Sequence, residues 1–213
     1  MIGIVYATRR EAEPFLKMAD ARVLTKRPFR IFEFSLPVPD RGTGVVIICG
    51  MGKVGAALGT QELIREYPLR HIINAGICGI LADRPDRGIG SIFRVDSVSE
   101  GEPGPGIPEG PWSCSSGLFL KLPVATLVSS ERPVFDVEER RALARWGQMV
   151  DMEGAIVARV AGMYGIPCTL LKGVTDFAGE GDREGLHRNL AVVVETMAGL
   201  LWDEIARLEI SDE

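Results

Sequence analysis

Hydrophobic residues along this chain alternate between short continuous runs and longer stretches with helical spacing. The continuous runs predict strands at residues 1–7, 29–36, 44–50, 71–79, 92–99, 121–130, 148–153 and 168–176. Apolar positions three and four apart predict helices at 8–19, 54–67, 135–147, 154–165 and about 184–208. The fourth of these helices is expected to stop at Gly165 and Pro167.

Strands that alternate with helices predict an α/β fold in which helices cover both faces of a sheet. A length of 213 residues suits one domain, over residues 1–213, and the chain shows neither a repeat nor a clear linker. Residues 99–117 are rich in glycine and proline, which predicts an irregular loop. Such a loop is either a plain connection or a lid over a substrate.

Composition narrows the class of protein. A net charge of -5 argues against general binding of nucleic acid, which favours a basic surface. No apolar run approaches the roughly 20 residues that cross a membrane, and the first run has no basic leader and is expected to be a strand. The scattered residues Cys49, Cys78, Cys114 and Cys168 have no zinc-site spacing, which predicts buried, reduced thiols in a cytoplasmic protein.

Gly50, Gly52 and Gly55 form a G-x-G-x-x-G pattern between a predicted strand and a predicted helix. A dinucleotide site also needs an acidic residue at the end of the second strand, roughly 20 residues further on. The next predicted strand has no carboxylate before Asp83. The pattern is therefore weak evidence for a nicotinamide or flavin cofactor, and a tight turn with close helix packing explains it as well.

Ligands of open α/β sheets bind beyond the carboxyl ends of the strands. The candidate acids and bases expected there are nearly all carboxylates, neither histidine follows a strand, and no G-x-S-x-G elbow is present. A serine hydrolase is therefore not favoured. Two carboxylates in a partly apolar cleft, with a third that holds hydroxyls, suit cleavage of a glycosidic bond. Each carboxylate taken alone is more often explained by a helix dipole, a cap or a turn, so only their combination indicates this chemistry.

Four stretches in order resemble the nucleoside phosphorylase and nucleosidase superfamily, on the branch of methylthioadenosine/S-adenosylhomocysteine nucleosidases and futalosine hydrolases. They are IGIVYATRREAE, GMGKVGAALGT, INAGICGIL and VDMEGAIVARVAGMYGIPCTLLKGVTDFA. The pair VDMEG and VTD, separated by a helix of the right length, is the most specific part. The resemblance implies a three-layer α/β/α sandwich with a mixed, twisted central sheet, in which the glycine turn lines a nucleoside site.

The resemblance also implies roles for individual residues. Asp176 matches the acid that protonates purine N7, which requires a carboxyl pKa raised by burial. Glu11 matches the carboxylate that orients the attacking water, and Glu153 matches the group that holds the ribose hydroxyls, with Met152 under the sugar. The base is expected to contact Thr175, Val134 and Phe135, and the 5′ group to contact Met51, Gly76, Ile77 and Leu186.

The chain departs from the family pattern at several positions. Ile77 replaces a small hydroxyl residue, Lys172 replaces an arginine, and Pro133 falls near the position of the base-stacking aromatic, which favours Phe135 as the stacker. The MEG form of the ribose motif resembles futalosine hydrolases more than methylthioadenosine nucleosidases. The resemblance therefore leaves open the base and the 5′ group, which is of the methylthioadenosine, S-adenosylhomocysteine or futalosine type.

The attacking nucleophile is either water or phosphate. A phosphorylase needs cationic groups around its phosphate, and the expected site loops contain Arg9, Arg10 and Arg132. Glu11 would repel phosphate at that place, so hydrolysis is expected. A phosphorylase of the same fold and a nucleoside-binding module without catalysis are the alternatives. The resemblance implies a purine nucleoside as small-molecule partner, no metal or organic cofactor, and a homodimer or larger homo-oligomer whose neighbouring loop closes the site.

Overall fold

The computed structural model describes residues 1–36, 42–82, 88–102, 104–105, 110–114, 117–178 and 183–208. The strands within these ranges are β1 Ile2–Tyr6, β2 Arg22–Thr25, β3 Arg30–Ser35, β4 Thr43–Ile48, β5 His71–Ile80, β6 Ile92–Glu100, β7 Trp112–Ser113, β8 Val124–Ser129, β9 Met149–Asp151 and β10 Cys168–Phe177. The helices are α1 Arg9–Met18, α2 Lys53–Glu66, α3 Val137–Leu143, α4 Gly154–Met163 and α5 Arg183–Arg207.

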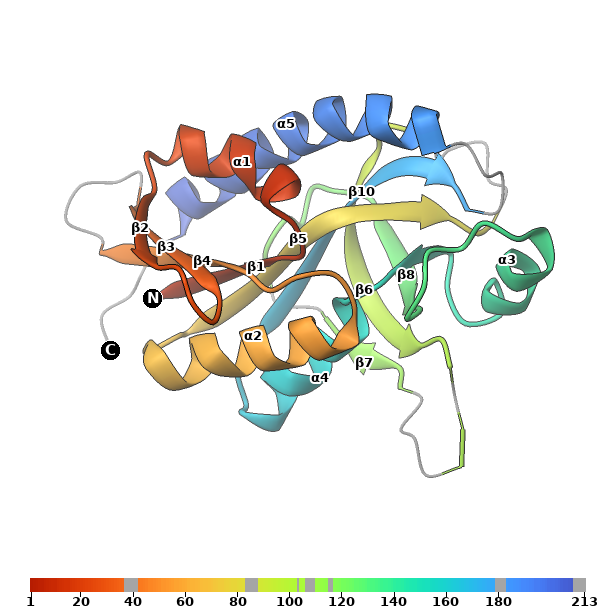
Figure 1. Cartoon of the computed structure of the whole chain (residues 1–213), viewed down its shortest axis with the longest axis horizontal. Coiled ribbons are helices and arrows are strands. Elements are labelled where there is room, and N and C mark those ends of the chain that lie inside the picture. The colour runs from red at the N-terminus through yellow and green to blue at the C-terminus, as the bar shows by residue number, and fades with distance from the viewer. Residues whose placement is uncertain are drawn as a thin grey trace.

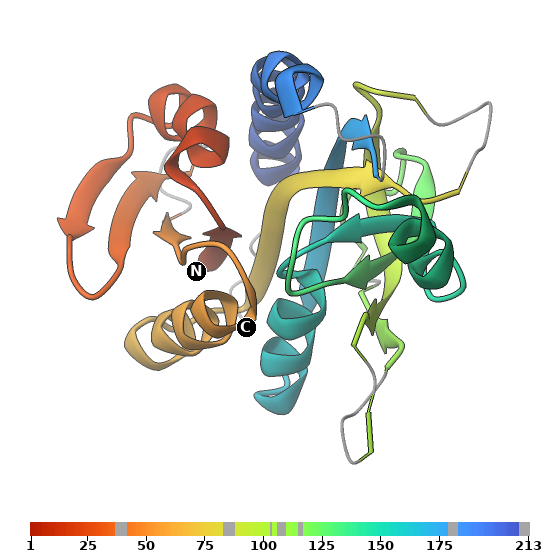
Figure 2. The same cartoon turned by 45° about the vertical axis from the view of Figure 1, so that its right-hand side comes forward.

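The described strands belong to one mixed sheet with the order β10-β6-β8-β9-β5-β1-β4-β3-β2, and β7 pairs with β6. β10 also pairs with β5 in parallel, so β5, β10, β6, β8 and β9 close on themselves. β5 pairs with three strands: its first half pairs with β1, its last two residues pair with β9, and β10 is the third partner. Figure 2 shows this strongly twisted arrangement around the long β5 strand.

Helices cover the sheet from two sides, which confirms the predicted α/β/α layers. α1 and α5 pack against each other on one face, and α2 and α4 on the other (Figure 1). Under α1 and α5, the rings of Phe15 and Phe34 meet edge to face with centroids 5.2 Å apart. β1 is buried along its whole length, as its continuous apolar run requires. No helix in the described ranges is long and apolar enough to cross a bilayer.

Two short strands differ from the sequence-based expectation. β2 was not predicted, because its residues are mostly exposed and only pairing with β3 defines it. The predicted irregular loop at 99–117 is wrong in part: β6 continues to Glu100, and Trp112–Ser113 pairs with β6 as β7. Residues 103, 106–109, 115 and 116 of that stretch lie outside the described residues. The helix predicted at 135–147 is shorter, because Asp136 caps it and it ends at Leu143.

Candidate active site

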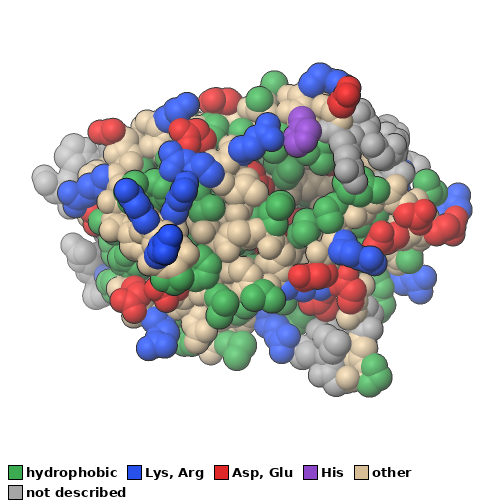
Figure 3. Space-filling view, viewed as in Figure 1, with side chains coloured by type: hydrophobic (Ala, Val, Ile, Leu, Met, Phe, Trp, Pro, Cys, Tyr) green, Lys and Arg blue, Asp and Glu red, His purple; other side chains and the backbone are tan. Residues whose placement is uncertain are grey.

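A pocket of about 390 Å³ opens at the carboxyl ends of β1, β5 and β10, where the sequence placed its candidate residues. Figure 3 shows a hollow on this face of the molecule, with hydrophobic and basic side chains at its rim. The lining residues are Ala7, Thr8, Arg10, Glu11, Met51, Ile77, Cys78, Gly79, Arg132, Pro133, Val134, Phe135, Val150, Asp151, Met152, Glu153, Thr175, Asp176, Ala178, Leu186, His187 and Leu190. The pocket is therefore mostly apolar, with carboxylates at a few positions.

Asp176 enters the pocket from the end of β10. The register of β10 against β5 shifts between Val174 and Asp176, and this bulge lets the consecutive residues Thr175 and Asp176 both line the pocket. The Thr175 hydroxyl donates a hydrogen bond of 2.8 Å to Asp176 Oδ1, which orients the carboxyl group. A side chain at Gly79 would place its Cβ 3.0 Å from Asp176 Oδ2, so the glycine leaves room for the acid.

Glu11 lies in the first turn of α1 and is held at three points. Its Oε2 accepts from the backbone N–H and the hydroxyl of Thr8, at 2.9 and 2.7 Å, in a capping box. Its Oε1 accepts from the backbone N–H of Ile77 in β5, at 3.1 Å. The same carboxylate therefore caps a helix and faces the pocket. A role in helix capping does not exclude a role in catalysis for this residue.

Glu153, the residue just before α4, connects the start of that helix to the glycine turn. Its Oε1 accepts from the backbone N–H of Gly52 at 2.7 Å, although the two residues are 101 positions apart. Gly52 has a φ of 89°, which L-residues with side chains rarely adopt. Burial, followed by the nearby charge of Asp151, raises the pKa of Glu153 to about 7. The turn thus presents an amide to a carboxylate of the same chain.

A buried ammonium group balances the carboxylates below the pocket. Lys172 Nζ contacts Asp151 Oδ2 at 2.7 Å and donates to Asn74 Oδ1 at 2.7 Å. Burial alone would lower the pKa of Lys172, but the charges of Asp151 and Glu153 outweigh it and raise the pKa. Asp151 also accepts from the Ser129 hydroxyl at 2.5 Å and from the Gly154 N–H at 2.8 Å. This chain of contacts joins β5, β10, β9, β8 and the start of α4.

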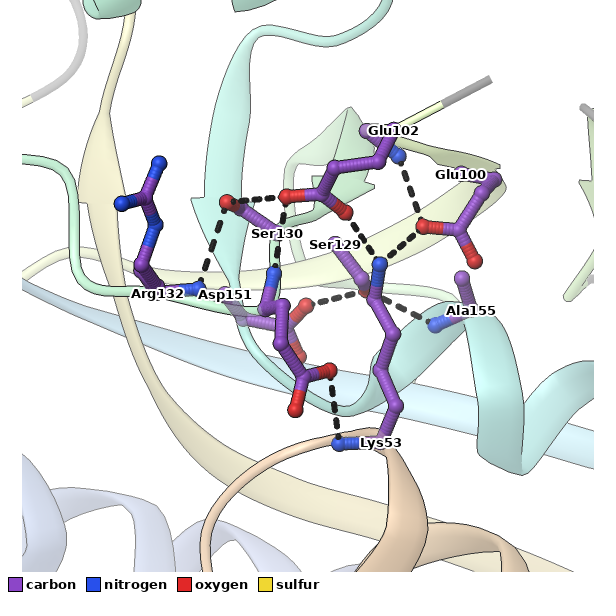
Figure 4. A network of polar contacts seen from close by, with 10 residues as sticks. Lys53, Glu100, Glu102, Ser129, Ser130, Arg132, Asp151 and Ala155 are labelled. Atoms are coloured by element: carbon purple, nitrogen blue, oxygen red, sulfur yellow. Dashed lines mark hydrogen bonds and ion pairs between the residues drawn. The ribbon is translucent and has the colours of Figure 1, made fainter. Parts of the chain in front are cut away.

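A second polar cluster holds three loops together beside the pocket (Figure 4). Lys53, at the start of α2, forms ion pairs with Glu100 and Glu102. Glu102 Oε1 in turn accepts from the Ser130 hydroxyl at 2.8 Å and from the Glu131 N–H at 3.0 Å. Since the lining residues Arg132 to Phe135 follow directly, this cluster ties the loop at 130–135 to the glycine turn.

The basic residues near the pocket separate into two groups. Arg10 and Arg132 line the pocket, as does His187 from α5. Arg9 turns away: its guanidinium lies 5.0 Å from the centre of the Phe32 ring, and it forms an ion pair with Glu13. Arg9 faces another hollow, which is also lined by Lys26, Arg27 and Arg30. The two consecutive arginines therefore do not converge on one anion.

Most residues singled out from the sequence meet in this pocket. Those that line it are Asp176, Glu11, Glu153, Met152, Thr175, Val134, Phe135, Met51, Ile77 and Leu186. Gly76 does not line it but lies behind Glu11, since a Cβ at Gly76 would be 3.0 Å from Glu11 Oε1. The roles of these residues stay predictions.

Sequence reasoning gave no role to Asp151, Ser129 or Lys53, and it missed His187. Asp151 and Ser129 were identifiable from their positions at the ends of strands, whereas Lys53 and His187 lie on helices and carried no such signal. The four cysteines are free and buried, as predicted.

Comparison with known proteins places the chain in a family. A family model described as "Phosphorylase superfamily" matches residues 1–108 and 113–206. The chain is 30% identical over 164 residues to the 5′-methylthioadenosine/S-adenosylhomocysteine nucleosidase of Chromohalobacter salexigens, covering 65% of this chain and 69% of that protein.

Solved structures show the same fold. The futalosine hydrolase of Helicobacter pylori strain 26695 superimposes with a TM-score of 0.86, at 22% identity over 97% of each chain. The 5′-methylthioadenosine/S-adenosylhomocysteine nucleosidase of Helicobacter pylori, solved with butyl-thio-DADMe-Immucillin-A, gives a TM-score of 0.85 at 22% identity. That match covers 97% of this chain and 98% of the other.

Proposed function

The chain belongs to the phosphorylase superfamily, and from this premise we propose that it is a nucleosidase that hydrolyses the N-glycosidic bond of a 5′-modified purine nucleoside. The observation that carries the proposal is the convergence of Asp176, Glu11 and Glu153 on one largely apolar pocket. Each carboxylate comes from a different element, and each is oriented by a hydrogen bond within the chain. This arrangement matches what departure of a purine base demands.

In the proposed reaction, Asp176 donates a proton to N7 of the purine while the bond between C1′ and the base nitrogen breaks. Positive charge develops on the sugar, and the Glu153 carboxylate accepts hydrogen bonds from the ribose hydroxyls, which strengthen as that charge grows. Glu11 orients a water molecule toward C1′ and accepts its proton as the new C–O bond forms. The products are the free base and the free sugar, and proton exchange with solvent restores Asp176 and Glu11.

Water is favoured over phosphate as the nucleophile by the surroundings of Glu11. The hydrogen-bond donors that hold the Glu11 carboxylate, from Thr8 and Ile77, are uncharged, and a carboxylate at this position would repel phosphate. Arg9, a candidate phosphate-binding residue, forms an ion pair with Glu13 outside the pocket. A phosphorylase remains the second candidate because Arg10 and Arg132 line the pocket.

The test is release of free base from a panel of 5′-modified adenosines, futalosine and inosine, each with and without phosphate. Replacing Asp176 by Asn should reduce kcat about 10²- to 10⁴-fold, the usual contribution of a general acid. Asp203→Asn is the matched control, because Asp203 is exposed on α5 and does not line the pocket. Release that depends on phosphate would establish the phosphorylase instead, and binding of adenine without turnover of any substrate would favour a binding module.

We also propose that two copies of the chain associate through α2. Met51, Val54 and Leu58 expose 70%, 70% and 53% of their surface, and they follow one another along one side of the glycine turn and α2. Figure 3 shows exposed hydrophobic side chains along the lower edge of the face that carries the hollow, where α2 lies in Figure 1. Because Met51 lines the pocket, a second copy seated there would also cover the mouth of the pocket.

A further inference from the structure

Arg10 and His187 form a polar pair at the mouth of the mostly apolar pocket. They come from the first turn of α1 and from α5, 177 positions apart, and Arg10 Nη1 lies 3.4 Å from His187 Nδ1. Both side chains are exposed and both line the pocket. The proposed hydrolysis of the glycosidic bond uses neither of them, so another part of the ligand is the group that meets this pair.

The chemistry of the two side chains defines what they can bind. Arginine carries only donors, so in this contact His187 Nδ1 is the acceptor and the imidazole proton resides on Nε2. The remaining guanidinium N–H groups and His187 Nε2–H are then available as donors. The ion pairs of the described residues do not include Arg10, whereas Arg9 is paired with Glu13. A permanent positive charge beside a second N–H donor is suited to an anionic oxygen group.

The side chains that line the pocket next to this pair are mostly apolar. Leu186 and Leu190 line the pocket from the same part of α5 as His187, and Ile77 lines it from β5. An anionic group held deeper in the pocket would lie among these apolar side chains and share the pocket with the Glu11 and Glu153 carboxylates. A substituent with an apolar stretch next to the sugar and an acidic group at its far end fits both the walls and the mouth.

We propose that the 5′ substituent of the substrate ends in a carboxylate, which Arg10 and His187 bind at the mouth of the pocket. The inference rests on the proposed function and deepens it, because it selects acid-bearing nucleosides over those with a short neutral 5′ group. Arg10 and His187 act here as specificity-determining residues and take no part in bond cleavage.

The experiment compares two nucleosides that differ only in charge. One carries a 5′-thioether chain of three carbons that ends in a carboxylate, and the other ends in the primary carboxamide; both are made as adenosine and inosine forms. The wild-type protein should turn over the carboxylate with a kcat/KM about tenfold higher, at the lower end of what a hydrogen bond to a charged group contributes, because both side chains are exposed. Arg10→Gln should remove that preference and leave the carboxamide within about twofold.

Arg9→Gln is the matched control, since it removes the same charge from the same helix turn but faces away from the pocket. It should keep the preference for the carboxylate. His187→Gln should reduce the preference partly, because it replaces one neutral donor by another. Equal losses for the carboxylate and the carboxamide in Arg10→Gln would overturn the inference, as would equal turnover of the two nucleosides by the wild-type protein.

Binding separates this inference from the proposed function. Asp176→Asn, which retains the pocket mouth, is titrated with both nucleosides by calorimetry. Tighter binding of the carboxylate that disappears in the double variant Arg10→Gln/Asp176→Asn supports the inference even if no substrate is hydrolysed. Equal affinity for the carboxylate and the carboxamide contradicts it even if hydrolysis is efficient.

Discussion

The ionisation of single residues in the pocket depends on an excess of carboxylates around one buried cation, Lys172. Lys172 is 1% exposed and lies between Asp151 and Asn74, and Glu153 is close enough for its charge to raise the pKa of Lys172. One ammonium cannot neutralise two buried carboxylates, and Asp151 makes the direct contact. Glu153 is therefore the group whose ionisation is disfavoured: its burial, and then the nearby charge of Asp151, raise its pKa to about 7 although Lys172 opposes them.

We predict that binding of a nucleoside below pH 7 releases a proton from Glu153. The folded, empty protein holds that proton below a pKa of about 7, whereas ribose hydroxyls donate to the ionised carboxylate and lower its pKa in the complex. Affinity should therefore rise with pH up to about 7 and then level off. Asp151, Lys172 and Glu11 are the charged groups that face Glu153 and set this window.

Calorimetry at pH 6 in two buffers of different ionisation enthalpy measures the released proton. About 0.9 proton is expected per nucleoside at that pH if the complex is fully ionised. Glu153→Gln should abolish the release, and the enthalpy should then be independent of the buffer once other groups are accounted for. Identical wild-type enthalpies in the two buffers would contradict the assignment of Glu153 to the ribose hydroxyls.

At the scale of secondary-structure elements, the glycine turn between β4 and α2 determines how closely the helix approaches the strand. A Cβ at Gly55 would lie 2.4 Å from the Cys49 carbonyl oxygen, a distance that only a backbone shift relieves. The third glycine of the G-x-G-x-x-G pattern thus serves helix packing, and the second orients an amide toward Glu153. Close helix packing and the amide that faces Glu153 therefore explain the glycine spacing, which does not require a dinucleotide.

We predict that Gly55→Ala destabilises the protein by about 1–3 kcal/mol, because overpacking against backbone outweighs the better helix propensity of alanine. Gly199→Ala is the matched control, since nothing lies within 4 Å of a Cβ built at Gly199 in α5. That variant should be stabilised by about 0.5–1 kcal/mol. Chemical denaturation of both variants measures the difference, and equal effects of the two substitutions would contradict the packing argument.

The Lys53 cluster joins elements that are distant in the sequence. Lys53 exposes 17% of its side chain and Glu100 exposes 6%, so removal of the ammonium leaves a buried carboxylate without its partner. Burial lowers the pKa of Lys53, but the two glutamates outweigh it and raise the pKa, so the lysine stays charged. The loop at 130–135 is tied to this charge through Glu102, which bonds to Ser130 and Glu131.

We predict that Lys53→Met raises KM about three- to tenfold with a smaller change in kcat, because the loop that carries Arg132 to Phe135 loses its anchor. The free energy of unfolding should fall by about 1–3 kcal/mol. Lys53→Arg should restore KM in part, and Lys121→Met, an exposed lysine outside the cluster, should change neither quantity. A fall in kcat at constant KM would argue against this positioning role.

At the scale of the whole molecule, the closed group of β5, β10, β6, β8 and β9 brings the carboxyl ends of separate strands to one rim. α1 and α5 meet above that rim, so the first and last helices both contribute to the pocket. The exposed residues Met51, Val54 and Leu58 lie beside the same opening. The pocket and the proposed contact between copies are therefore neighbours on the surface.

We predict that the wild-type protein is a dimer and that Val54→Asp/Leu58→Asp yields monomers with a higher KM, because two charges in an apolar contact are costly to desolvate. Val192→Asp is the control, since Val192 is 66% exposed on α5 and lies outside this stripe. Sedimentation velocity gives the mass of each form. A monomeric wild-type protein, or a dimer unchanged by the double substitution, would contradict the proposed interface.

The order of strands and helices and the residue types at the strand ends were determined by the sequence itself, because apolar periodicity and turn residues act over a few positions. These local signals placed Glu11 at a helix start, Asp176 at the end of a buried strand and Glu153 just before a helix. The same signals misjudged β2 and β7, which exist only through pairing with neighbouring strands.

Contacts between distant parts of the chain were decided only by the tertiary structure. The Gly52–Glu153 and Lys172–Asn74 hydrogen bonds span 101 and 98 positions, and no local pattern records them. The divergence of Arg9 and Arg10, and the meeting of Arg10 with His187, depend on how α1 and α5 dock on the sheet. The sequence supplied the chemical groups, and strand pairing and helix packing set the distances between them, because those distances arise only once the chain has folded.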